Sequence, residues 1–130
     1  MTNLRRLVVV VDDEPLIREY ALDVLGSAGL EARGFASAAE TLAFLRDHAD
    51  ETGAVFADLW LENPYEGVGL TRTISTTWPW IALLVTSGAS ARPPGGLPMK
   101  AHYVVKPWRA ELILRFLRKF VAPGRRPEAA

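Results

Sequence analysis

Five short apolar runs recur along the chain, and longer stretches with apolar residues three or four positions apart lie between most of them. Continuous runs of this kind are typical of strands that are buried on both faces of a parallel sheet. The second run is less apolar than the first, which places it nearer a sheet edge. The pattern therefore predicts strands at 7–11, 30–35, 54–59, 80–85 and 102–105.

The stretches between the runs carry helix signals. Pro15 fits the first turn of a helix, Gly29 can end it, and Ser37 with Glu40 forms a capping box that opens a second helix. We expect a short third helix over 70–77, closed by Trp78-Pro79, and a last helix over 109–120. The apolar faces of the first two predicted helices are Ile17, Tyr20, Ala21, Val24, Leu25 and Ala28, and Leu42, Ala43, Leu45 and Ala49.

Two stretches interrupt this alternation. Residues 59–70 are rich in helix breakers and are expected to form a loop, and residues 89–99 hold two adjacent prolines and two glycines that exclude a normal helix. With right-handed crossovers, the chain is predicted to be an α/β protein with a doubly wound, five-stranded parallel sheet in a flavodoxin-like three-layer sandwich. The fourth helix is expected to be short or absent.

Length and composition limit the function classes. The 130 residues, 49% of them hydrophobic, suit one domain over 1–121, with 122–130 as a disordered tail. Fifteen basic and fifteen acidic residues leave no cationic excess for nucleic acid, and the absence of cysteine excludes disulfides and thiolate chemistry. No stretch resembles a membrane span or a signal peptide, so a cytoplasmic protein that contacts neither membrane nor nucleic acid is expected. His48 is interpreted as a solvated helix-end residue.

Polar residues follow four of the five predicted strands. Because the carboxyl ends of parallel strands meet at one edge of the sheet, these side chains are expected to face one crevice. The acids could instead complement a helix N-terminus, and Asp58 could be a turn former or helix cap. The residues are Asp12, Asp13 and Glu14 after the first strand, Asp58 at the end of the third, Thr86 after the fourth and Lys106 after the fifth.

Carboxylates flanked by an ammonium and a hydroxyl suit a hard divalent cation and an anion with several oxygens. Mg²⁺ accepts such oxygen ligands, while Lys106 and Thr86 can contact phosphoryl oxygens. A carboxylate in this setting stays ionised and can attack phosphorus to give an acyl phosphate. Pro107 after Lys106 could make that peptide bond cis.

Four ordered motifs covering nearly the whole chain resemble the receiver domain of bacterial two-component response regulators. They are Val10-Val11-Asp12-Asp13-Glu14-Pro15, Ala57-Asp58-Leu59, Val85-Thr86-Ser87-Gly88 and Tyr103-Val104-Val105-Lys106-Pro107. The resemblance implies a phosphorylatable regulator that takes a phosphoryl group from a sensor histidine kinase or a phosphotransfer protein. It would relay or drain the signal through an unknown downstream protein, with Mg²⁺-dependent self-phosphorylation and self-dephosphorylation as its only chemistry.

The resemblance also implies residue roles. Asp58 would be the phosphoacceptor, Asp13 would bind Mg²⁺ with help from Asp12 through water, and the Trp60 carbonyl would be a third protein ligand. Thr86 and Lys106 would contact the phosphoryl group, and Thr86 and Tyr103 would form the switch. Tyr103 could instead be a rim aromatic that covers Pro107.

The sequence departs from the family pattern at two places. The loop after Asp58 is longer than in the family and has a different sequence. The bulky Trp60 also stands two residues after the phosphoacceptor, which puts the rate of phosphoryl loss in doubt. The Pro/Gly-rich 89–99 resembles a subset of stand-alone receivers in which a loop replaces the fourth helix. Two other functions stay open: a pseudo-receiver acting as a constitutive interaction module, and an aspartyl-phosphate hydrolase, whose usual second acid is replaced by Trp60.

Overall fold

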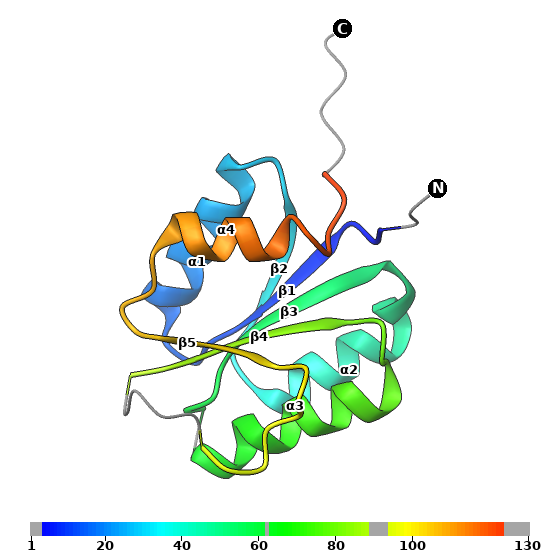
Figure 1. The fold of residues 1–130 in the computed structure, drawn as a ribbon, viewed down its shortest axis with the longest axis vertical. Coiled ribbons are helices and arrows are strands. Elements are labelled where there is room, and N and C mark those ends of the chain that lie inside the picture. The colour runs from blue at the N-terminus through cyan, green and yellow to red at the C-terminus, as the bar shows by residue number, and fades with distance from the viewer. Residues whose placement is uncertain (1–3, 62, 89–93, 124–130) are drawn as a thin grey trace, which may run out of the picture.

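The computed structural model describes residues 4–61, 63–88 and 94–123. Strands and helices alternate through its first half, as Figure 1 shows. The strands are β1 (Leu7–Val11), β2 (Glu31–Phe35), β3 (Thr52–Asp58), β4 (Ala82–Ser87) and β5 (His102–Val105). The helices are α1 (Pro15–Ser27), α2 (Ala38–His48), α3 (Pro64–Thr77) and α4 (Ala110–Leu117), with a 3₁₀ turn at Ala49–Glu51.

All five strands form one parallel sheet in the order β2-β1-β3-β4-β5. Helices α1 and α4 cover one face of the sheet, and α2 and α3 cover the other (Figure 1). The predicted doubly wound three-layer sandwich is confirmed, and the less apolar β2 is at an edge. In this order the chain reverses direction across the sheet at β1, so a crevice is expected outside the ends of β1 and β3.

Each face of the sheet has its own core. On one face, Val8 and Val10 pack with a cluster that includes Leu25 and Ile113, and on the other Val9 and Val11 pack with residues such as Ile74. All five residues of β1 and all seven of β3 are buried. Since both faces of these strands are covered, their uninterrupted apolar runs lack polar alternation.

The third helix is longer than the sequence predicts, because α3 begins at Pro64 and not at residue 70. The assignment of 59–70 to a loop is therefore wrong over its second half. Asn63 is the N-cap, its side-chain oxygen accepting from the Glu66 N–H at 2.9 Å, and Pro64 takes the first helical position. Asn63 and Pro64 disfavour the interior of a helix, but both are favourable at its first positions.

Other element bounds differ by a few residues. Strand β4 begins at Ala82 and includes Thr86 and Ser87, which pair with β5. Helix α4 ends at Leu117, three residues short of the predicted end, and Val121 instead forms a parallel bridge with Arg5. The Lys106-Pro107 bond is cis, the form that the sequence left open.

Between β4 and β5, residues 94–101 contain no helix, which agrees with the predicted loss of the fourth helix. The rest of the predicted loop, 89–93, and most of the predicted tail, 124–130, lie outside the described residues. The domain limits of 1–121 and 122–130 stay a prediction. Among the described residues, no helix is long and apolar enough to cross a membrane.

Candidate functional site

The strand-end residues converge at the carboxyl edge of the sheet. Asp12 directly follows β1, Asp58 is the last residue of the neighbouring β3, and Thr86 is its register partner in β4. Lys106 follows β5, and its N–H donates to the Ser87 carbonyl at 3.1 Å. Four strands therefore deliver side chains to one place.

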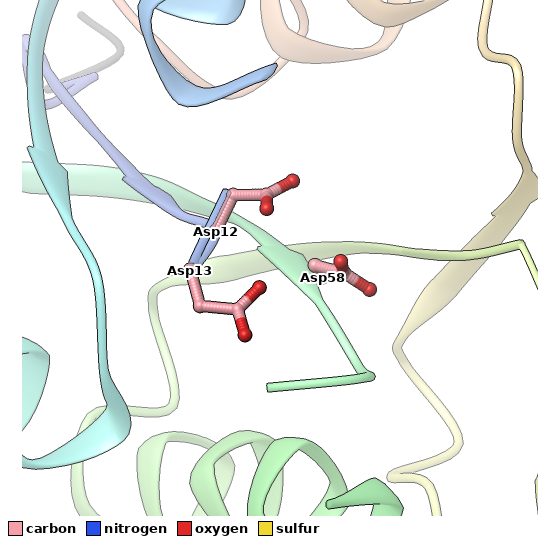
Figure 2. A group of neighbouring side chains, drawn as sticks. All are labelled: Asp12, Asp13 and Asp58. Carbon is pink, nitrogen blue, oxygen red and sulfur yellow. The ribbon is translucent and has the colours of Figure 1, made fainter. Parts of the chain in front are cut away.

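Three carboxylates form the acidic part of the site. Asp12, Asp13 and Asp58 each offer an oxygen, and these oxygens lie within 4.8 Å of one another. In Figure 2 the three side chains point in roughly the same direction, to the right of the view. Asp12 and Asp58 are buried, at 4% and 5% exposure, whereas Asp13 is exposed. Like charges this close repel, so the cluster favours a cation.

Lys106 supplies the opposite charge. Its ammonium donates to Asp58 Oδ2 at 2.8 Å and lies 3.5 Å from Asp12 Oδ2. Burial alone would lower the pKa of Lys106, but the hydrogen bond and charge of Asp58, with the charge of Asp12, raise that pKa above its ordinary value. The lysine therefore stays protonated across the physiological range, which suits it to neutralise an anion at this place.

Asp12 is held from several directions. Its N–H donates to the Phe35 carbonyl at 3.1 Å, its Oδ1 accepts from the Glu14 N–H at 2.9 Å, and its carbonyl accepts from Arg18 Nη1 at 2.8 Å. Burial raises the pKa of Asp12, and the Asp58 charge adds to this; the Glu14 and Lys106 contacts oppose it. The ionised form of the Asp12 carboxyl is therefore unfavourable here unless a further cation binds beside it.

The Thr86 hydroxyl is a buried polar group without a partner. Of the buried side-chain nitrogen and oxygen atoms in the described residues, only Thr86 Oγ1 has no hydrogen bond. Buried polar groups are nearly always paired, so an exception requires an explanation. Because Thr86 is the register partner of Asp58, this hydroxyl is available to a group attached to that carboxylate.

The segment after Asp58 is tightly placed. Trp60 N–H donates to Asp58 Oδ1 at 2.9 Å, and Leu59 N–H donates to the Thr86 carbonyl at 2.8 Å. The Trp60 side chain is 51% exposed and does not fill the site. A Cβ on Gly67 of α3 would overlap the Leu59 carbonyl group, so this helix touches the segment's backbone directly.

Two residues near the site were missed by sequence reasoning. Arg18 resembles an ordinary charged residue on a helix, and Gly67 lies in a stretch whose breakers indicated a loop. No signal in the sequence could have singled out Gly67, because Gly69 beside it has no atom within 4 Å of its Cβ position. By contrast, His48 is less solvated than the sequence predicts, because its ring stacks on Phe44 with centroids 4.4 Å apart and its Nδ1 lies 2.9 Å from Glu51. Tyr103 lies in β5 opposite Val85 and is half-buried.

The donor set fits a hard divalent cation. Its ligand atoms are carboxylate oxygens, which Mg²⁺ prefers, and one of the three carboxylates is exposed, so that the ion could keep several waters. Together with the partly buried Lys106 ammonium and the buried, unpaired Thr86 hydroxyl, this donor set matches recognition of a phosphoryl group better than a structural ion site.

The chain belongs to the response regulator receiver domain family, whose model matches residues 8–118. Receiver domains typically bind Mg²⁺ at an aspartate cluster such as this one, and the cluster is suited to phosphorylation. The matched region contains every residue of the site described above. The class that the motifs indicate is therefore confirmed.

Individual relatives agree with this assignment. A protein of Rickettsia bellii, named as an NtrX-like response regulator, is 25% identical over 116 residues, which are 86% of this chain and 24% of that protein. The crystal structure of the receiver domain of NtrX from Brucella abortus matches with a TM-score of 0.71 and 26% identity, covering 86% of this chain and 95% of that one.

A receiver domain protein from Clostridium thermocellum has the same fold, with a TM-score of 0.78 and 23% identity over 87% of this chain and 91% of that one. The chain spans about a quarter of the length of the curated relative that it matches.

Proposed function

We propose that this chain is a phosphorylatable receiver that accepts a phosphoryl group on Asp58 from a histidine kinase or a phosphotransfer protein. The observation that carries the proposal is the 2.8 Å contact between Lys106 and Asp58, inside a cluster that includes Asp12 and Asp13. This pairing places an ammonium beside the carboxylate nucleophile, at the position where phosphoryl oxygens would lie.

The transfer itself needs few groups. One carboxylate oxygen of Asp58 forms a bond to phosphorus while the bond from phosphorus to the donor's histidine nitrogen breaks, and that nitrogen keeps the electron pair. The product is an acyl phosphate, which water hydrolyses to restore the carboxylate. Lys106 neutralises one phosphoryl oxygen, and the unpaired Thr86 hydroxyl donates to another.

Asp13, Asp58 and the Trp60 carbonyl would hold Mg²⁺, with Asp12 contributing through water. A bound Mg²⁺ would neutralise charge on the transferring phosphoryl group. The support lies in the acidic cluster for the three aspartates. For Trp60, the support is its position directly beside Asp58, where its N–H already contacts the carboxylate.

Output would pass to a downstream protein near Tyr103 and Trp108, with Thr86 and Tyr103 as the switch. Trp108 stacks on the exposed Tyr20 with ring centroids 5.4 Å apart. Trp108 is partly buried, with its ring edge-on to Phe56 at 5.3 Å, so the exposed part of this aromatic group is mainly Tyr20. An aromatic group of this kind suits a protein contact. The net charge of zero argues against nucleic acid as the partner, and we place the protein in the cytoplasm, away from membranes.

The alternative is a pseudo-receiver that binds its partner constitutively. The complete site argues against it, because a chain that no longer needs phosphorylation has no reason to leave the Thr86 hydroxyl buried and unpaired.

The decisive experiment is incubation with acetyl phosphate and Mg²⁺, followed by intact-mass measurement. We expect one added phosphoryl group in the wild type and none in Asp58→Asn. A wild-type protein that gains no mass would support the pseudo-receiver. Phosphorylation of Asp58→Asn at the wild-type rate would show that another residue is the acceptor.

A further inference from the structure

The carbonyl oxygen of Asp12 lies past the end of the β1–β2 ladder. The last hydrogen bond of that ladder is the one from Asp12 N–H to the Phe35 carbonyl, and β2 ends at Phe35. A buried carbonyl at this point needs a donor from elsewhere. Arg18, the fourth residue of α1, provides it at 2.8 Å through Nη1.

Gly34 of β2 makes room for the arginine. A Cβ at Gly34 would lie 3.1 Å from Cγ and 3.2 Å from Cδ of Arg18, and 2.9 Å from Leu22 Cδ1. The aliphatic part of Arg18 therefore lies directly over this glycine, between α1 and the edge strand. From there the side chain returns toward the helix N-terminus, the direction that helical side chains favour.

The peptide group that Arg18 holds is the link between Asp12 and Asp13. Fixing the Asp12 carbonyl fixes the plane of that peptide, and with it the direction from which both side chains leave the backbone. Asp13 is exposed, so its carboxylate depends on the backbone for its placement. In Figure 2 both carboxylates extend toward Asp58.

We propose that Arg18, seated on Gly34, is a positioning residue for the Asp12–Asp13 pair and thereby sets the Mg²⁺ affinity of the site. The inference rests on the proposed function, because it assigns Arg18 a role in the same metal and phosphoryl site. Arg18 touches neither the ion nor the phosphoryl group in this account. It acts only through the Asp12 backbone.

Because Arg18 is charged, the direction in which the Mg²⁺ affinity changes on its removal tests the inference. A guanidinium beside the acidic cluster repels a cation, so if charge were its main effect, removing it would tighten Mg²⁺ binding. If positioning is its main effect, the same substitution weakens binding. Arg18→Met keeps much of the aliphatic length and removes both the donor and the charge.

The experiment is a Mg²⁺ titration of the whole chain, followed by tryptophan fluorescence and by calorimetry. Arg18→Met should weaken Mg²⁺ binding by about tenfold, the lower end of the effect for groups that orient metal ligands. Gly34→Ala crowds Leu22 and the Arg18 stem and keeps the arginine's charge, so it should weaken binding in the same direction and by less. It touches only side-chain atoms, so it offers a second route if Arg18→Met fails to fold.

The matched control is Arg33→Met. Arg33 adjoins Gly34 in β2 but is exposed and pairs with Val9, whose side chain packs on the other face of the sheet. It removes the same charge without touching Asp12, so the Mg²⁺ affinity should stay within about twofold of wild type.

The outcomes separate the two proposals. A wild-type protein that neither binds Mg²⁺ nor gains a phosphoryl group refutes the proposed function. A wild type that does both, with Arg18→Met or Gly34→Ala binding Mg²⁺ as tightly or more tightly, overturns only the role of Arg18. Loss of thermal stability with unchanged Mg²⁺ affinity would show that Arg18 is merely structural, which also overturns the inference.

Discussion

At the scale of single residues, Gly67 is where helix α3 contacts the backbone next to Asp58. Its missing side chain lets α3 contact the backbone of Leu59, the residue after Asp58. Leu59 is itself buried and donates to the Thr86 carbonyl. A group at Gly67 would therefore push on the segment that carries the candidate nucleophile.

Gly67→Ala should destabilise the protein by about 2–3 kcal/mol, the upper part of the range for overpacking, because the added Cβ meets rigid backbone. The free energy of unfolding from urea titration measures this. Gly69→Ala is the matched control on the same helix, since nothing lies within 4 Å of its Cβ. There we expect a gain of about 0.5–1 kcal/mol from helix propensity. Equal effects at both positions would contradict the close approach.

The residues that sequence reasoning found and missed differ in one physical respect. Asp58, Thr86 and Lys106 could be predicted because strand ends in a parallel sheet converge, whatever the packing details. Arg18 and Gly67 act through contacts between a helix and the backbone just after a strand: Arg18 with Asp12, and Gly67 with Leu59. No local pattern distinguishes an arginine that binds a carbonyl from one that faces solvent.

At the scale of elements, α3 depends on its cap. Its sequence is rich in threonine and glycine, which are poor helix formers, so packing of Leu70 and Ile74 and capping at Asn63 must stabilise it. This explains the wrong helix start predicted from the sequence: the same Asn-Pro pair is typical of loops and of helix beginnings. Only the tertiary contacts of the helix decide between them.

Asn63→Ala should lower the free energy of unfolding by about 1 kcal/mol, because the Glu66 N–H loses its side-chain acceptor at 2.9 Å and keeps only the longer bond to the Asn63 carbonyl at 3.3 Å. Asn63→Asp keeps an acceptor at the cap and should leave stability nearly unchanged. Urea unfolding of both variants makes the comparison. If the two variants were equally destabilised, the side-chain cap would not be the cause.

At the scale of the whole molecule, the topology follows from rules that need no detailed packing. Alternation of apolar runs with helical spacing, together with right-handed crossovers, leaves few arrangements for five strands. The lower hydrophobicity of β2 already placed it at an edge. The other edge strand, β5, is short and partly exposed, and the described part of its connection to β4 has no helix.

This asymmetry predicts where the molecule responds to phosphorylation. A phosphoryl group on Asp58 would engage Thr86 in β4 and Lys106 after β5, the strands farthest from β2. Since segment 94–101 contains turns but no helix and β5 pairs on one side only, this half of the sheet is the easier to reorder. We expect beryllofluoride with Mg²⁺ to slow amide exchange in 94–105 and to leave β2 and α2 unchanged. Asp58→Asn, treated identically, should show no difference. Equal exchange of 94–105 in both states, in a protein that mass measurement shows to be phosphorylatable, would exclude this half of the sheet as the route of the signal.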